Sequence, residues 1–115
     1  MTVIVRKAST FFGRIVLSDS EQNGLLLSEQ DKLIFSVKKS LNEDDGDQDY
    51  VICKVLTADN EFQGGYVFEL SPEDTNIPTG RYFYDIAIQR ENGDFYHVTI
   101  PDEFIIKQSI SRRKD

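Results

Sequence analysis

Side chains that could bind a cation are concentrated in one short stretch, LNEDDGDQDY, at residues 41–50. Five carboxylates stand between Glu43 and Asp49, and one glycine interrupts them. An EF-hand loop with its glycine at that place would take its first ligand from Leu41 and its closing acid from Ile52, and neither side chain can coordinate calcium. The favoured interpretation is therefore an exposed polar hairpin connection.

A looser calcium site is the alternative for this loop, with Glu43, Asp45 and Asp47 as its ligands. The favoured interpretation needs no metal, and no cofactor is expected. The chain has one cysteine and one histidine, Cys53 and His97, which together cannot form a zinc site of thiolates and imidazoles. Cys53 has no partner for an internal disulfide, so we expect it to be a small buried apolar side chain.

His97 is the natural candidate for a general base. No activated serine or cysteine, nucleophile elbow or oxyanion loop is recognisable, so a hydrolase is the least favoured hypothesis and the chain is not expected to be an enzyme. Gly64-Gly65 is followed by Tyr-Val-Phe-Glu-Leu, without the lysine of a phosphate-binding loop, and indicates a turn or bulge before a strand. Phe83, Phe95 and Tyr50 are candidates for an exposed aromatic patch that contacts a protein partner.

The charge balance is acidic, with 13 basic and 20 acidic residues and a net charge of −7. Because such a surface repels a phosphate backbone, no nucleic-acid partner is expected. Residues 1–108 are expected to form one domain, and the basic residues 109–115 a disordered, solvated tail. The N-terminus lacks the order of a secretion signal and the apolar runs are short, which predicts synthesis in the cytoplasm and no membrane partner.

The elements that position these side chains are predicted to be strands, because apolar residues alternate along the chain and no window of eleven or more residues has a helical stripe. The predicted strands cover residues 2–7, 11–17, 32–39, 49–56, 65–70, 81–90, 94–100 and 103–108. In the third strand the residues expected to face a core are Leu33, Phe35 and Val37. Those expected to face water are Lys32, Ser36 and Lys38. A strand with one apolar face needs a second sheet to cover it.

The turn at residues 91–93 has two possible registers. A two-residue Asn-Gly turn would put His97 on the same face as the isoleucines of the preceding strand. Polar side chains would then lie opposite apolar ones, and the apolar residues of the two strands would not share one core face. A three-residue loop with Gly93 in a left-handed conformation pairs Arg90 with Asp94 instead and puts His97 on the solvent side. We favour this loop, which brings together the core pairs Tyr84–Ile100, Ile86–Val98 and Ile88–Tyr96.

A corner between two sheets is predicted at residues 71–80. Ser71 is a capping hydroxyl, Pro72 stands at the first helical position, and Asp74 supplies a carboxylate three residues after the cap. This pattern predicts one short helical turn at residues 71–75.

The fold class predicted by these elements is all-β, an immunoglobulin-like antiparallel β-sandwich of about 7–8 strands. Pro78 and Gly80 fit a type I turn that leads into the penultimate strand. Tyr82 then has the place of a tyrosine corner, whose hydroxyl reaches back to the preceding connection. Tyr84 stands where antibody domains have a disulfide cysteine, so an aromatic core is expected in place of the bridge. A bend is expected at Pro101.

The corner also resembles a module common in phage and prophage tail and baseplate proteins. The resemblance rests on Phe68-Glu-Leu-Ser-Pro-Glu-Asp-Thr75 and on Ile77-Pro-x-Gly-x-Tyr-x-Tyr-Asp-Ile86. It extends over residues 31–107, since LIFSVKKS at 33–40, ENGD at 91–94 and EFIIK at 103–107 match the module in order. The family that the chain resembles is the immunoglobulin-like N-terminal domain of the phage baseplate upper protein and its relatives.

The resemblance implies a virion structural protein that attaches one tail component to another, without cofactor or catalysis. Its expected partners are other tail or baseplate proteins, or copies of itself, and its expected location is the virion. The alternative is a carbohydrate-binding β-sandwich module, assisted by calcium bound to Glu43, Asp45 and Asp47.

Overall fold

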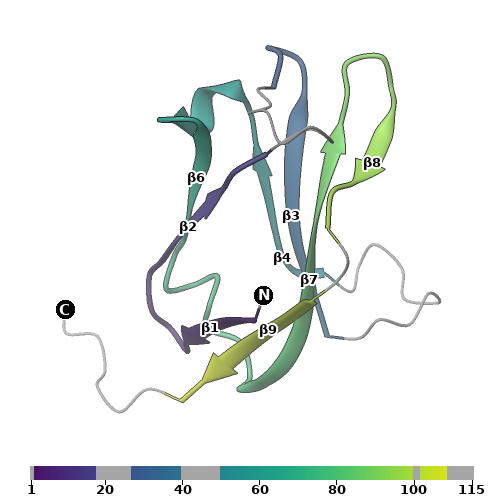
Figure 1. Ribbon diagram of the computed structural model, residues 1–115. Helices are drawn as coiled ribbons and strands as arrows, with labels where there is room; N and C mark the ends of the chain where they lie inside the picture. Colours follow the sequence, from purple (N-terminus) through teal and green to yellow (C-terminus); the bar gives the residue numbers. More distant parts are fainter. Residues whose placement is uncertain (1, 18–26, 40–49, 100–101, 109–115) are drawn as a thin grey trace.

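The structure is a computed structural model that describes residues 2–17, 27–39, 50–99 and 102–108 (Figure 1). The acidic stretch with Glu43, Asp45 and Asp47, Pro101 and the tail 109–115 lie outside these residues. The strands are β1 (Val3–Arg6), β2 (Phe11–Ile15), β3 (Lys32–Lys38), β4 (Tyr50–Leu56), β5 (Glu61–Phe62), β6 (Gly65–Leu70), β7 (Gly80–Gln89), β8 (Phe95–His97) and β9 (Asp102–Lys107).

Two sheets form the layers of a sandwich (Figure 1). The larger sheet has the order β1-β9-β7-β3-β4, with β8 paired to the upper part of β7, and the smaller sheet has the order β2-β6-β5. All pairs are antiparallel except β1 with β9. The orders β9-β7-β3-β4 and β2-β6-β5 correspond to the strands G-F-C-C′ and B-E-D of immunoglobulin domains. The predicted all-β sandwich is therefore confirmed.

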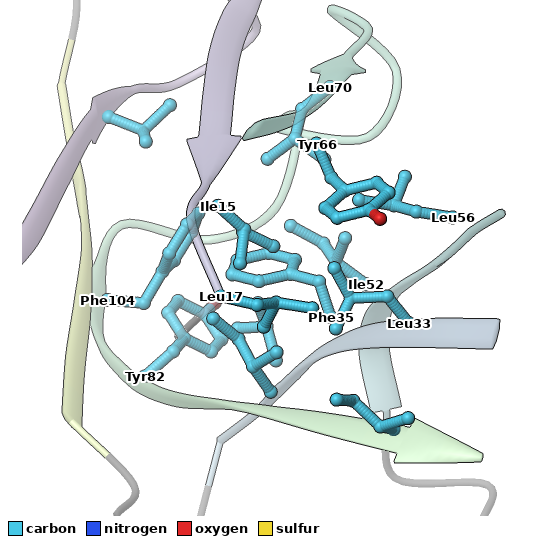
Figure 2. Packing of buried hydrophobic residues seen from close by; sticks show 14 of the residues in the cluster. Ile15, Leu17, Leu33, Phe35, Ile52, Leu56, Tyr66, Leu70, Tyr82 and Phe104 are labelled. Atoms are coloured by element: carbon cyan, nitrogen blue, oxygen red, sulfur yellow. The ribbon is translucent and has the colours of Figure 1, made fainter. Parts of the chain in front are cut away.

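Aromatic rings fill the centre of the core. The Phe35 ring lies 4.9 Å from that of Phe68, 5.6 Å from that of Tyr84 and 6.2 Å from that of Phe104, measured between centroids. Figure 2 shows side chains of both sheets meeting in this layer. The prediction that Leu33, Phe35 and Val37 face the core is confirmed, since all three are buried. Aromatic packing thus occupies the space between the sheets where antibody domains place a disulfide.

The link between β1 and β2 crosses from the larger sheet to the smaller one and is held by Thr75. The Thr75 side chain is fully buried, and its hydroxyl accepts from the Ser9 amide at 2.8 Å and donates to the Ser9 carbonyl at 2.7 Å. The Thr75 carbonyl accepts from the amide of Ala8, which has φ 57°. Thr75 therefore provides hydrogen-bond partners for backbone groups of Ala8 and Ser9, which lie between the two sheets and pair with no strand.

The 57–65 region was not predicted in detail. The 3-10 helix η2 (Ala58–Asn60) is closed by a capping box between Thr57 and Asn60, and the short β5 follows it. A two-residue loop with positive φ at Gln63 and Gly64 then connects β5 to β6. The glycine turn was predicted from the sequence but β5 was missed, because two residues are too few to show alternation.

Two expectations about exposure in the β3–β4 pair are wrong. Ser36 was expected to face water but is only 7% exposed, because β3 is a central strand and its neighbours β4 and β7 cover the small side chain. Cys53 was expected to be buried but is exposed. It lies directly opposite Ser36 on the outer face, while the adjacent Ile52 points into the core.

The register of the β7–β8 hairpin is confirmed as the three-residue loop. Ala87 pairs with His97, and the Arg90 amide donates to the Asp94 carbonyl at 2.7 Å. The expectation that Tyr96 and Val98 are core residues is wrong, since they are 52% and 42% exposed. Their register points both side chains toward the inner face of the larger sheet. They stay exposed because β8 lies at an edge, paired only with β7, and the three described strands of the smaller sheet do not cover it. The remaining expected pair, that of Tyr84, includes residue 100, which lies outside the described residues.

Candidate interaction surface

The corner at residues 71–80 brings three of the predicted structural residues together. The Tyr82 hydroxyl donates to the Pro78 carbonyl at 2.7 Å, and Gly80 between them has φ 145°, a conformation that side chains disfavour. Burial raises the pKa of Tyr82, so its hydroxyl stays a donor at neutral pH. The ring itself is fully buried. This is the geometry of a tyrosine corner, and it holds the entry to β7 in place.

Asp74 closes the turn that precedes Pro78. Its carboxylate accepts from the Ser71 amide at 2.8 Å, and its own amide donates to the Ser71 hydroxyl at 3.1 Å. Lys54 of β4 forms an ion pair with the same carboxylate at 2.9 Å. Burial alone would raise the pKa of Asp74, but the hydrogen bonds from Lys54 and Ser71 outweigh it and lower that pKa. The corner is thereby tied to the larger sheet.

Removing the Tyr82 hydroxyl tests the corner. Tyr82→Phe is expected to lower the free energy of unfolding by about 1 kcal/mol, or the Tm by about 5 °C, because the Pro78 carbonyl loses its partner. The control is Tyr96→Phe, which removes the exposed hydroxyl bound to Asp94 and should change the stability by less than about 0.5 kcal/mol. Equal effects in urea unfolding would contradict a structural role for the corner contact.

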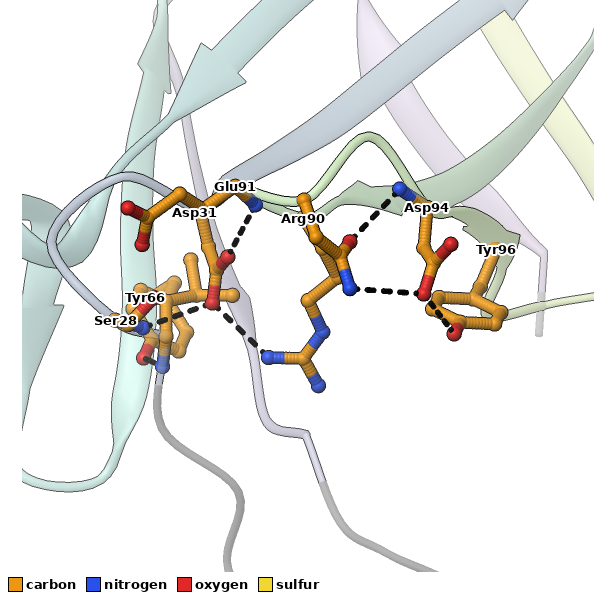
Figure 3. A network of polar contacts seen from close by, with 9 residues as sticks. Ser28, Asp31, Tyr66, Arg90, Glu91, Asp94 and Tyr96 are labelled. Carbon is orange, nitrogen blue, oxygen red and sulfur yellow. Dashed lines mark hydrogen bonds and ion pairs between the residues drawn. The ribbon is translucent and has the colours of Figure 1, made fainter.

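A buried carboxylate beside the β7–β8 turn was not identified from the sequence. Asp31 is 2% exposed, and its oxygens accept from the Ser28 amide at 3.0 Å, the Arg90 guanidinium at 2.9 Å and the Glu91 amide at 3.0 Å (Figure 3). The hydrogen bonds from the Ser28 backbone and side chain, with those from Glu91 and Arg90, lower the pKa of Asp31 to about 2. Gly93, in the same turn, has φ 95°.

The Asp31 contacts connect the two sheets. Four residues before Asp31 in the chain, the Leu27 amide donates to the Tyr66 hydroxyl of β6 at 2.6 Å, so the segment at residues 27–31 is bonded to the smaller sheet. Arg90 follows β7 and belongs to the larger sheet. These interactions explain the buried charge as part of the scaffold, because each carboxylate oxygen has a donor.

His97 lies on the outer face of the larger sheet, where its ring is 3.5 Å from the Asp85 carboxylate and stacks edge-on against Phe95. Asp85 pairs with Ser36 on the next strand, which places serine, aspartate and histidine in a line on one face. In a catalytic triad the imidazole contacts the nucleophile, whereas here the aspartate lies between them. The described residues therefore assemble no triad around His97.

The outer face of the larger sheet carries uncharged side chains in its central part. Val55 of β4, Ile34 of β3 and Ala87 of β7 form one cross-strand row, which ends at His97. Cys53 lies beside this row and is exposed, and Val55 is 52% exposed. Ile34 is half-buried and Ala87 is buried. We call the group Val55, Ile34, Ala87 and Cys53 the outer row. Sandwich strands normally alternate apolar core residues with polar outward residues, so this group is unusual.

The three aromatic candidates are divided between two ends of this face. Tyr50 and Phe83 both pair with Lys38, whose ammonium group lies 5.1 Å from the centroid of the Tyr50 ring. Phe95 is exposed but pairs with Gln89, at the opposite end of β7. They therefore flank the outer row and do not form one aromatic patch.

The smaller sheet has its own exposed apolar residues on its outer face: Phe12, Val16, Phe62 and Val67. Arg14 stands among them, and its guanidinium crosses Gly65 and donates to the Gln63 carbonyl at 2.7 Å. Glu69 pairs with Phe12 on this face. Arg14 and Glu69 therefore divide the apolar surface here, whereas the outer row has no charged residue within it.

In the part of the chain that the structure describes, no three His, Cys, Asp or Glu side chains are placed to share a metal ion. No described helix has the length and apolar character needed to cross a membrane. No protein-family model, curated protein or solved structure matches this chain.

Proposed function

We propose that this protein is a non-enzymatic interaction module that binds another protein on the outer face of its larger sheet. The observation that carries the proposal is the outer row, in which Val55, Ile34 and Ala87 cross three strands without a charged residue. The exposed surface of this group comes from Val55 and Cys53, with half-buried Ile34 beside them, and apolar surface that is bordered by polar groups is typical of protein contacts. Here the polar borders are His97 at the β8 end of the row and, along the strands on one side of it, Asp85 and then Lys38.

We propose a phage or prophage tail or baseplate as the setting. The resemblance of residues 31–107 to the immunoglobulin-like modules of such proteins supports this placement, and the β-sandwich fold is the one that the resemblance requires. The partners would be other tail or baseplate proteins, and the location would be the virion. No cofactor takes part in such docking, because the surface itself is the functional element.

Virion particles from an induced host lysate test the placement. Antibody against the protein is expected to label tail tips in electron micrographs, and particles that carry none of it would contradict the tail role. Binding to a glycan array that disappears with a chelator would instead favour the carbohydrate-binding alternative.

A pair of matched variants tests the surface. Val55→Glu puts a charge into the outer row and is expected to weaken co-sedimentation with tail particles by about tenfold or more, since a carboxylate would be buried in an apolar contact. The control is Val67→Glu, which changes another exposed strand valine, on the outer face of the smaller sheet. Circular dichroism should show both variants folded. Equal loss of binding in the two variants would show that the face is wrongly assigned.

A further inference from the structure

The free edge of β4 is the longest free strand edge in the described part of the chain. β4 pairs with β3 and with no other described strand, and its seven residues include no proline and one charge. That charge, Lys54, is already bound to Asp74 within the chain. Natural sheets usually protect a long edge strand with charges, prolines or a cover, because its unpaired amides and carbonyls can pair with another strand.

We infer that two copies of this chain pair through β4, antiparallel and with Cys53 of one copy opposite Cys53 of the other. The inference names one partner for the interaction module proposed above and rests on that proposal. It joins the larger sheets of both copies into one continuous sheet across a two-fold axis. The outer rows of the two copies then lie side by side on one face of this sheet.

The sequence of β4 favours a second copy as the partner. When two β4 strands pair antiparallel about Cys53, the residues that lie opposite each other are compatible. In the antiparallel arrangement Val55 lies opposite Val51 of the second copy, and both are exposed. Lys54 lies opposite Ile52, so the only charge of the strand does not meet itself. A pairing centred one residue later would place Lys54 against Lys54, and like charges directly opposite each other destabilise a strand pair.

The charge of the whole chain limits where two copies can meet. With a net charge of −7, most contacts between copies are repulsive, whereas β4 and its neighbour β3 carry no acidic residue. The five carboxylates at residues 43–49 precede Tyr50 in the chain. Antiparallel pairing sends the two Tyr50 ends in opposite directions, about 20 Å apart along the strand, which exceeds the screening length of about 8 Å at physiological salt.

A break in the β3–β4 ladder sets the extent of the pairing. Val37 pairs with Ile52 but Lys38 pairs with Tyr50, so Val51 is an extra residue on β4. A bulge of this kind bends the strand and ends regular pairing. We therefore place the contact between copies on the five residues from Val51 to Val55, with Cys53 at their centre.

Disulfide trapping tests the register. Two Cys53 thiols on the axis lie within disulfide distance, so diamide, which takes two electrons and two protons from them, is expected to link most of the purified chains as dimers. The matched control is Val55→Cys in a Cys53→Ser background. It places an exposed thiol on the same strand and face, but the two copies are four residue steps, or about 13 Å, apart and should not be linked. Equal linking in both proteins would mean random collision and would overturn the inference.

The mass in solution tests the contact without a disulfide. In light scattering, Cys53→Ser is expected to have the mass of two chains. Cys53→Lys is expected to have the mass of one chain, because pairing would place two ammonium groups opposite each other. Cys53 is exposed, so both variants should fold, which circular dichroism checks. A Cys53→Ser protein that stays monomeric at millimolar concentration overturns the inference. If the protein is a monomer but antibody still detects it at tail tips, the proposed function holds without the inference. If it is a dimer but is absent from the particles, the inference is supported and the tail role is contradicted.

Discussion

Phe35→Ala is expected to lower the free energy of unfolding by about 3–5 kcal/mol, a large part of the total stability of a domain of this size. Phe35 is 3% exposed and stands on the central strand β3, where its ring contacts those of Phe68, Tyr84 and Phe104. Its removal leaves a cavity that rings from three other strands line. These strands belong to both sheets, so the structure cannot collapse into the space without moving the layers.

Urea unfolding of Phe35→Ala measures this effect, and Phe62→Ala is the matched control. Phe62 is 56% exposed on the two-residue strand β5, so the same truncation there should change the stability by less than about 0.5 kcal/mol. A loss for Phe35→Ala no larger than that of the control would contradict a close-packed aromatic core.

Asp31→Asn is the second large expected effect, with a fall in Tm of about 10 °C at pH 7. The carboxylate of Asp31 accepts from the Ser28 amide, the Arg90 guanidinium and the Glu91 amide. An asparagine has one accepting oxygen in place of two, so at least one buried donor loses its partner and Arg90 loses its counter-ion. Asp94→Asn is the control, because that carboxylate lies at the same turn but its contacts are exposed.

The pH dependence of stability gives an independent measure of Asp31. Its pKa is about 2 in the folded protein and about 3.9 in the unfolded chain, so the unfolded chain takes up the proton first as the pH falls. The stabilisation is therefore present above about pH 4 and is lost as the pH falls toward 2. Asp31→Asn should lose less stability than the wild type over this range, and equal losses would show that Asp31 does not titrate as proposed.

The strands and the register of the β7–β8 hairpin were predictable because both depend on the pattern of apolar residues within a short stretch of sequence. Alternation along KLIFSVK identified Leu33, Phe35 and Val37 as the inward residues of β3. In the β7–β8 hairpin, a slip of one residue would turn every side chain to the opposite face, so the apolar pattern was enough to choose the three-residue loop. Strand β5 was missed because it has only two residues.

Burial on the outer faces and at the edges was not predictable in the same way. Ser36 is polar but buried, and Cys53 is exposed, although the two are direct cross-strand neighbours. Their surroundings depend on strand order, since β3 is flanked on both sides and β4 on only one. Tyr96 has the inward register of a core residue but lies where the described smaller sheet leaves the larger one uncovered.

Sequence alone was therefore enough to predict the all-β class, most of the strands, the glycine turns and the residues of the tyrosine corner, because each depends on neighbours within a few positions along the chain. The folded structure was needed to show that Asp31 meets Arg90, that Val55, Ile34 and Ala87 form one row, and that β4 pairs with no described strand besides β3. These features join residues from distant parts of the chain. Strand order and the packing of the layers set such contacts, and no local pattern encodes them.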